Sequence, residues 1–303
     1  MSHYTAQILW ERNGTPAGEV YARLVRMNDG DFHARHRPGV LGAASRFPLA
    51  EIAQAAAQAA LDLAPRLDAN ALLSALPVQS MARLLGVAAA RLDLTVGWVQ
   101  DFVQGIAPSA SGQAVSAASR AALELAAQGE AQGLDAVQSA NRIALMQQSL
   151  EATAGLLGNT VRLMQRRPDL GAAEASLDAW RNTVAEVARW DSPVQNTRRF
   201  AANDLTLAGQ PIAQGQGVVL VLASANRDES LNRDPDAFDA QRRDRRSLSF
   251  GAGGHACPGE AIAIEIAAAG LCALQAAGPL ERVFGRSIGY RASTSARIPV
   301  FEI

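Results

Sequence analysis

The sequence has only two cysteines in 303 residues and no long run of charge of one sign. Cys257 and Cys272 lie 15 residues apart, and a disulfide framework is not expected in a large cytoplasmic chain. The formal net charge of −1 argues against a nucleic-acid footprint and against a polybasic patch for a membrane surface. We therefore expect neither nucleic acid nor a membrane as a partner, and each thiol needs its own explanation.

Long hydrophobic runs are also missing from the beginning of the chain. Charges are scattered through residues 1–20, with no apolar core of signal-peptide length and no stretch long enough to span a bilayer. This pattern predicts a cytoplasmic protein. A structural zinc site usually needs four nitrogen or sulfur ligands, and two cysteines with four scattered histidines make such a site a weak hypothesis.

What the sequence does have is apolar residues, which make up 49% of the chain, many of them alanines in helical patterns. Alanine-rich tracts at residues 50–64 and 261–270 favour helix, because alanine loses no side-chain entropy when it becomes ordered. The sequence therefore predicts a mainly α protein with small β-sheets. No internal repeat, linker or boundary divides it, and we expect one domain over residues 1–303.

The periodicity of apolar residues predicts where the main elements lie. A series of amphipathic helices is expected between residues 48 and 128, with breaks at 66–70, 86–93 and 107–113. The proline-free run 133–166 predicts one helix roughly 50 Å long, at about 1.5 Å of rise per residue. A shorter helix over 177–190 should stop before Pro193. Residues 203–228 and 288–303 alternate β-type runs with turns, which predicts a small C-terminal sheet content.

The stretch FGAGGHACPG, residues 250–259, places one of the two cysteines in a glycine-rich loop. Pro258 favours a helix start directly after Cys257, and a helix N-terminus should lower the pKa of the thiol and favour the thiolate. Glycines in the loop let the backbone approach a flat partner closely. This context suits an axial metal ligand. A structural buried cysteine and a nucleophile activated by His255 are the alternatives.

The same stretch resembles the haem-binding loop of the cytochromes P-450, Phe-Gly-x-Gly-x-(His/Arg)-x-Cys-x-Gly. The resemblance implies a P-450-like fold with haem b, iron protoporphyrin IX, as the cofactor. It makes Cys257 the thiolate ligand of the haem iron and Phe250 the ring that packs beneath the porphyrin. It also makes His255 a partner of a haem propionate, and Gly259 the last specified residue of the cofactor-binding loop.

Two further segments, both C-terminal to the long helix, extend the resemblance in the expected order. Glu186 and Arg189 match the family's buried Glu-x-x-Arg pair, although such a pair alone is more often a solvated helix face. Arg199 matches an arginine that reaches a propionate. Ala237 stands where many relatives carry a third basic residue, so we expect a smaller ion network than usual.

Nearer the N-terminus, the stretch DGDFHARHR resembles the family's His-x-x-x-Arg segment. The resemblance implies that His33 and Arg37 clamp the haem propionates, and an arginine fork facing a carboxylate suits that task. Only about thirty residues precede this segment, so we expect a shortened relative that lacks much of the usual N-terminal region. The pocket would then be more open, or covered by another subunit in a homo-oligomer.

The segment LEATAGLLGNT resembles the family's oxygen-binding helix and suggests the distal residues. Glu151 falls at the acid position, and Ala152 falls where a threonine usually helps to deliver protons to bound dioxygen. Thr153 lies one position on, about 100° around the helix, while Gln148 and Ser149 replace a small Ala-Gly pair. The candidate catalytic residues are therefore Glu151, Thr153 and Gln148.

Three functions remain open at this stage. The first is a monooxygenase that oxidises a small organic substrate, with ferredoxin and a reductase as redox partners. The second is a peroxide-dependent peroxygenase, or a haem-dependent dehydratase or isomerase. The third is a haem-binding sensor or partner subunit without turnover. The thiolate ligand favours O–O cleavage and thereby the first two, whereas the missing threonine should weaken proton delivery.

Overall fold

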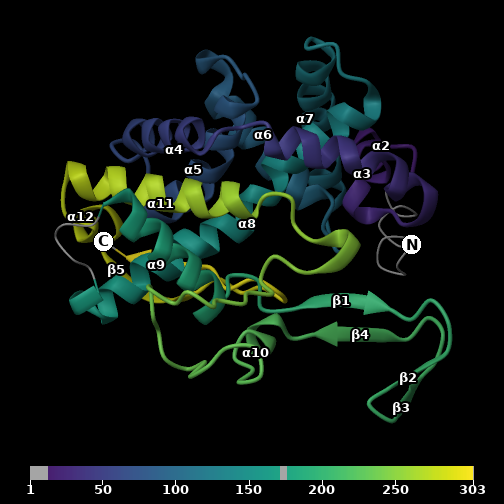
Figure 1. The fold of residues 1–303 in the computed structure, drawn as a ribbon. Coiled ribbons are helices and arrows are strands. Elements are labelled where there is room, and N and C mark those ends of the chain that lie inside the picture. Colours follow the sequence, from purple (N-terminus) through teal and green to yellow (C-terminus); the bar gives the residue numbers. More distant parts are fainter. Residues whose placement is uncertain (1–12, 171–175, 303) are drawn as a thin grey trace.

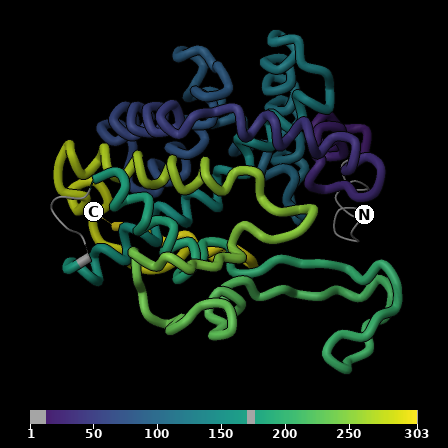
Figure 2. The backbone as a smooth tube through the Cα atoms, in the orientation of Figure 1, coloured from purple at the N-terminus to yellow at the C-terminus, as the bar shows by residue number. Residues whose placement is uncertain are grey.

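The computed structural model describes residues 13–170 and 176–302, and most of them are helical (Figures 1 and 2). The helices are α2 (Pro16–Ala22), α3 (Gly30–Ser45), α4 (Leu49–Leu63), α5 (Ala69–Leu84), α6 (Leu92–Gly105), α7 (Gly112–Glu130), α8 (Ala136–Arg166), α9 (Leu177–Trp190), α10 (Leu222–Ala225), α11 (Glu260–Ala277) and α12 (Leu280–Phe284). Short 3-10 turns are η1 (Val25–Met27), η2 (Ala89–Arg91), η3 (Pro168–Leu170) and η4 (Gly253–His255). The predicted long helix and the predicted helix over 177–190 are confirmed.

The described strands pair into two-stranded antiparallel sheets. The strands are β1 (Thr197–Phe200), β2 (Leu205–Leu207), β3 (Gln210–Ile212), β4 (Gly217–Leu220), β5 (Arg286–Tyr290) and β6 (Pro299–Glu302). β1 pairs with β4, β2 with β3, and β5 with β6. The β pattern predicted over 203–228 ends earlier, because residues 222–225 form α10 and bury Leu222. The expected class, mainly α with small sheets, is confirmed.

Helix α8 is the longest element and crosses the molecule behind α11 in the view of Figure 1. Its first turn is fixed by a capping box between Asp135 and Gln138. Two glycines let it approach other segments closely. A Cβ at Gly155 would lie 2.9 Å from the carbonyl oxygen of Arg297, and one at Gly158 would lie 2.8 Å from Cδ of Pro299. Any side chain there would push α8 away from β6.

The sequence patterns missed two N-terminal helices, α2 and α3. Thr15 caps α2 through a hydrogen bond to the amide of Gly18, and Pro16 lies at the first helical position. Helix α3 has Pro38 in its interior and little amphipathic character, so its pattern did not stand out. It nevertheless carries the His-x-x-x-Arg segment, whose histidine and arginine are spaced by one helical turn.

Helix α11 is the one described helix that is long and apolar enough to cross a membrane, judged by length and composition. Half of that segment is buried inside the fold, and its side chains join the hydrophobic core with residues of α4, α8 and α9. Its apolar character is thus accounted for by the core. The helix begins at Glu260, directly after the cysteine loop, and so carries that loop on a rigid element.

The ion network around α9 is larger than the sequence predicted. Glu186 and Arg189 are both fully buried and form an ion pair of 2.6 Å. Arg242 and Arg245 also donate to the Glu186 carboxylate, at 3.2 and 3.0 Å. The expectation that Ala237 leaves a small network is therefore wrong, because arginines five and eight positions later in the sequence take its place. The cluster fixes residues 226–246 behind the cysteine loop.

Candidate functional site

The cysteine loop, residues 250–259, is closed by its own backbone hydrogen bonds. The amide of Cys257 donates to the carbonyl of Phe250 at 2.8 Å, and the amide of Gly259 donates to the Cys257 sulfur at 3.3 Å. Gly251 and Gly253 both have a φ of 72°, a conformation that side chains other than glycine rarely adopt. The sequence therefore forms a tight turn that ends in a presented thiol.

The Cys257 side chain is exposed on one face, yet the protein atoms around its other faces withdraw it from bulk water. This desolvation raises the pKa of the thiol, and the carboxylate of Glu260 adds to the rise. The amide of Gly259 and the guanidinium of Arg37 act in the opposite direction but do not outweigh it. The predicted lowering of the thiol pKa is therefore wrong, mainly because the surrounding protein desolvates the sulfur, with a smaller contribution from the Glu260 carboxylate in the first turn of α11.

Histidines from two distant segments meet beside the loop. The rings of His33, on α3, and His255, in the loop, have centroids 4.2 Å apart. His255 Nε2 lies 2.9 Å from Asp29 Oδ1, and this hydrogen bond lowers the pKa of Asp29. The guanidinium of Arg37 donates to the carbonyl of Ala256. The structure therefore brings together the predicted residues on α3 and in the loop.

His33 has unused hydrogen-bonding capacity at this point. Its Nε2 atom is buried and has no hydrogen-bond partner among the described residues. Desolvation lowers the pKa of His33, and the positive charges of His255 and Arg37 add to the effect. A buried polar atom without a partner is uncommon in proteins. An acidic oxygen from a bound molecule would satisfy it.

Arg199 lies on β1 and is exposed. Its guanidinium donates to the hydroxyl of Thr197 at 3.0 Å and to the carbonyl of Arg198 at 2.8 Å. Among the described contacts, none joins it to the histidine pair. Its role as a propionate ligand stays a prediction.

The distal candidates lie on different faces of α8. Gln148 and Glu151 are exposed, one turn apart, whereas Thr153 is buried in the core with 2% of its surface exposed. Glu151 forms an ion pair of 2.7 Å with Arg291, a residue that the sequence patterns did not single out. The hydroxyl of Thr153 is thus separated from the face that carries the two exposed residues, and the catalytic roles of all three stay predictions.

One chain segment, residues 192–197, links α8 to the cysteine loop. The hydroxyl of Ser192 lies 2.6 Å from that of Ser249, next to Phe250, which packs on the hydrophobic core. A Cβ on Gly155 of α8 would lie 2.9 Å from Cβ of Pro193. This segment therefore packs against α8 on one side and against the residue that precedes the loop on the other.

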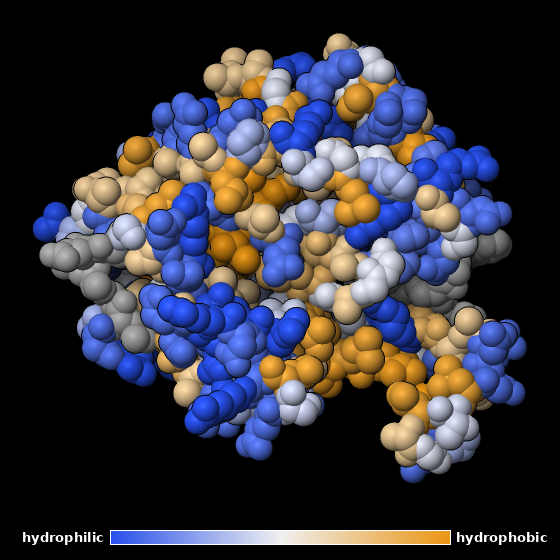
Figure 3. All heavy atoms as spheres, viewed as in Figure 1, coloured by the Kyte–Doolittle hydropathy of each residue, from blue (hydrophilic) through white to orange (hydrophobic). Residues whose placement is uncertain are grey.

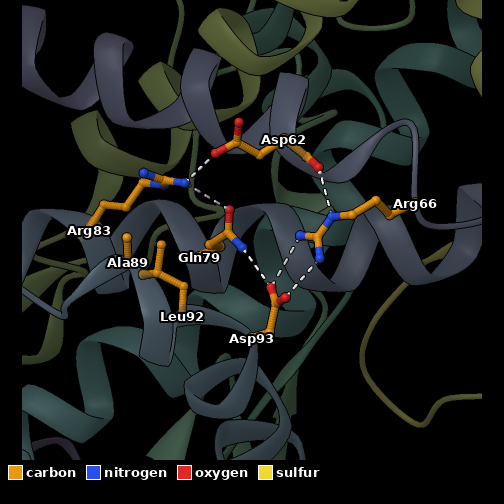
Figure 4. A pocket seen from close by; sticks show the side chains of 7 residues that line it. All are labelled: Asp62, Arg66, Gln79, Arg83, Ala89, Leu92 and Asp93. Atoms are coloured by element: carbon orange, nitrogen blue, oxygen red, sulfur yellow. Dashed lines mark hydrogen bonds and ion pairs between the residues drawn. The ribbon is translucent and has the colours of Figure 1, made fainter.

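A separate surface pocket of about 320 Å³ lies between α4, α5 and α6 (Figure 4). Arg66 pairs with Asp93 at 2.8 Å, and Arg83 pairs with Asp62. Buried Gln79 donates to Asp93 at 3.1 Å and lies at the centre of the group. Every charged side chain here has an oppositely charged partner, and none of the candidate site residues lines the pocket.

Comparison with known proteins shows what this chain and its fold are similar to. Residues 165–274 match the model of the family described as Cytochrome P450. The chain is 34% identical over 152 residues to cytochrome p450 CYP199A2 of Rhodopseudomonas palustris, a match over 48% of this chain and 37% of that protein. It is 39% identical over 114 residues to the biotin biosynthesis cytochrome P450 of Bacillus subtilis, over 37% of this chain and 29% of that protein.

Solved structures agree over most of the chain. P450 RauA, complexed with a biosynthetic intermediate of aurachin RE, superposes with a TM-score of 0.76 and 25% identity, over 92% of this chain and 76% of its own. P450BioI, in complex with an acyl carrier protein ligated to hexadec-9Z-enoic acid, superposes with a TM-score of 0.74 and 23% identity, over 94% of this chain and 81% of its own. The described chain therefore has the fold of these cytochrome P450 structures, and residues 165–274 match the family in sequence. Its sequence matches span 26 to 37% of the length of the curated relatives considered.

The residues present fit the haem group that the family implies. The exposed Cys257 thiol lies at the end of the loop, and Gly253 has open space where a Cβ would stand. Nε2 of His33, which has no partner within the part of the chain that the structure describes, and the guanidinium of Arg37 supply donors of the kind that propionates need. Both lie on the same helix, beside His255.

Proposed function

We propose that this chain is a haem-thiolate oxidoreductase, and specifically a monooxygenase that oxidises a small organic substrate. The observation that supports this most is the exposed Cys257 thiol in a closed loop, together with the buried Nε2 of His33, which has no partner in residues 13–170 and 176–302. Haem b, when bound, would supply the redox-active iron at which dioxygen is activated. Cytoplasmic location, a ferredoxin and a reductase belong to the same proposal.

The chain's own residues would act from two sides of the site, the cysteine loop and helix α8. On the loop side, Cys257 would ligate the iron, and His33, Arg37 and His255 would hold the propionates. Arg199 would join them from β1. These groups fix orientation, because a bidentate donor restricts the plane of the carboxylate that it binds.

On the α8 side, exposed Gln148 can hydrogen-bond to a bound molecule, and exposed Glu151 can exchange a proton with it. Glu151 is held by Arg291 at 2.7 Å, which keeps a carboxylate at a fixed place on this face. A general acid must reach the group that it protonates within hydrogen-bond distance or through one water. Glu151 is accordingly our choice for the proton relay.

Peroxide-driven oxidation is the second candidate, and one observation favours it. Ala152 follows Glu151 directly, and the hydroxyl of Thr153 is buried, so no hydroxyl stands beside the acid on the exposed face. Hydrogen peroxide brings the oxygen atoms, electrons and protons that dioxygen chemistry would otherwise have to assemble. A site that delivers protons weakly would therefore use hydrogen peroxide more readily than dioxygen, because peroxide already carries its protons.

Turnover with the two oxidants separates the candidates. The haem-loaded protein is incubated with a compound library, first with ferredoxin, reductase and dioxygen, and then with hydrogen peroxide alone. Product formation with the redox partners supports the monooxygenase. Product formation with peroxide alone supports the second candidate. Absence of product under both conditions would contradict both and favour a haem-binding protein without turnover.

A further inference from the structure

The residue before the cysteine loop, Ser249, is tied to the end of helix α9. Its hydroxyl donates to the carbonyl of Ala188, which lies in the last turn of α9, where carbonyls have no partner within the helix. The same hydroxyl oxygen accepts from Asn226 Nδ2 at 2.8 Å and lies 2.6 Å from Ser192 Oγ. The chain therefore enters the loop from a fixed point on α9.

Asn226 holds this entrance from a second direction. Its side chain is fully buried; its Oδ1 accepts from the amide of Leu248 at 2.6 Å, and its Nδ2 donates to Ser249. Its own carbonyl accepts from Arg189 at 3.2 Å, so the residue connects the ion network around α9 to the loop. An asparagine amide offers both an acceptor and donors, and here both sides hold the chain just before the loop.

The segment that contains Asn226 is hydrophilic on its outer face. Residues 226–249 lie below α9 in the view of Figure 1, and Figure 3 shows mostly hydrophilic side chains there. Arg227 forms one ion pair on this face with Asp236, whose side chain is 90% exposed, and exposed ion pairs contribute little to stability. A buried hydrogen bond is costly to leave unmade. The buried contacts of Asn226 and Ser249 should therefore restrain the chain before the loop more than such surface pairs do.

The entrance is coupled to the thiol through one residue. Phe250 directly follows Ser249, and its carbonyl accepts from the amide of Cys257 at 2.8 Å. The amide of Gly251 donates back to the carbonyl of Leu248 at 2.9 Å, which turns the chain at the same place. A displacement of the anchored entrance would therefore move the carbonyl that holds the Cys257 amide, and with it the sulfur.

We propose that Ser249 and Asn226 are positioning residues for the Cys257 sulfur. Among the described contacts, none joins either side chain to the thiol, so both act through Phe250, whose carbonyl holds the amide of Cys257. A ligand atom that must stay within about 0.5 Å of its productive position needs such supporting hydrogen bonds. The inference rests on the proposed function, because it takes the sulfur to be the ligand whose place is fixed.

Hydrogen exchange of the haem-free protein tests the positioning without any cofactor. Ser249→Ala should speed exchange of the Cys257 amide by about 2- to 10-fold, the effect of one hydrogen bond, while the amides of α8 keep their wild-type rates. Asn226→Ala should have at least this effect, because it removes two contacts. Ser249→Thr keeps the hydroxyl and should restore the wild-type rate. Ser119→Ala is the matched control and should leave the Cys257 amide unchanged, because Ser119 is also half-buried and donates to a backbone carbonyl, that of Val115 on α7, at 2.9 Å.

The haem-loaded protein gives a second readout. When reduced and treated with carbon monoxide, Ser249→Ala should contain a larger fraction of haem without the red-shifted Soret maximum than the wild type and Ser119→Ala do. Wild-type exchange of the Cys257 amide in both Ser249→Ala and Asn226→Ala would overturn the proposal. An equal increase in Ser119→Ala would also overturn it, because the effect would then be a general loss of stability. A wild type that lacks the red-shifted maximum would contradict the proposed function alone, since exchange in the haem-free protein does not depend on haem.

Discussion

His33 and His255 stand in ring contact, with centroids 4.2 Å apart, although more than two hundred residues separate them in the sequence. Asp29 engages His255 at 2.9 Å, while Nε2 of His33 keeps no partner among the described residues. The contact joins α3 to the cysteine loop. It leaves one of the two imidazoles with a buried nitrogen that has no partner in the described part of the chain, as our proposal of a propionate ligand requires.

His33→Ala should therefore weaken haem binding. A hydrogen bond to a charged group contributes about 1.5 to 3 kcal/mol, which corresponds to roughly a 10- to 100-fold loss of affinity. Titration of the haem-free protein with haem, followed by Soret absorbance, measures the change. His36→Ala is the control, because His36 lies on the same helix but stacks on Phe32. Equal affinities of the two variants would remove His33 from the site.

Ala152→Thr should improve the use of dioxygen. The substitution places a hydroxyl directly after Glu151 on a half-buried position of α8, where it can relay protons. We expect more product per dioxygen consumed with the redox partners, by up to about 10²-fold, the lower end of general acid–base effects. Turnover with peroxide should change little. Ala152→Ser provides a second hydroxyl variant, and unchanged coupling in both would contradict the assignment of this face.

Glu186→Gln should strongly destabilise the fold. The carboxylate is fully buried and accepts from Arg189, Arg242 and Arg245, so its loss leaves buried arginines without a counter-charge. Breaking a buried ion pair on one side typically costs about 3 to 5 kcal/mol of unfolding free energy. Urea unfolding measures it, with exposed Glu281→Gln of α12 as the control. A loss below about 1 kcal/mol, the range of exposed ion pairs, would show that the cluster is not essential for stability.

The same carboxylate predicts how stability depends on pH. Burial by itself would raise the pKa of Glu186, but hydrogen bonds from Arg189 and Arg245 outweigh burial and hold the pKa below its ordinary value. A carboxyl with a lowered folded pKa stabilises the protein above its unfolded pKa of about 4.3, and this stabilisation is lost as the pH falls through the folded pKa. The wild type should therefore lose stability below about pH 5 more steeply than Glu186→Gln. Parallel curves for the two proteins would contradict this.

The sequence predicted the elements that have strong local signals. The proline-free pattern of α8 and the proline that ends α9 determine these helices locally, and both were found where expected. The ten-residue cysteine motif indicated the resemblance to the family whose model matches residues 165–274. Helix α3 escaped prediction because Pro38 interrupts its pattern and its stability depends on tertiary contacts.

Tertiary geometry also explains what the sequence could not supply for the site. Arg291 pairs with Glu151 across 140 residues, and no local sequence pattern indicates such a partner. Arg242 and Arg245 reach Glu186 only because residues 226–246 fold back behind α9. The direction of the Cys257 pKa shift depends on how far the folded protein withdraws the sulfur from water and on the Glu260 carboxylate at the start of α11. Neither can be read from the local sequence.

The most direct test of the central assignment is the absorption spectrum of the haem-loaded protein, reduced and treated with carbon monoxide. The wild type and Cys272→Ser should both show the red-shifted Soret maximum that thiolate ligation produces. Cys257→Ser should lose it while keeping the circular dichroism of the wild type. A wild-type spectrum with an ordinary haem-protein Soret maximum, or a red shift that survives in Cys257→Ser, would contradict the assignment of Cys257 as the iron ligand.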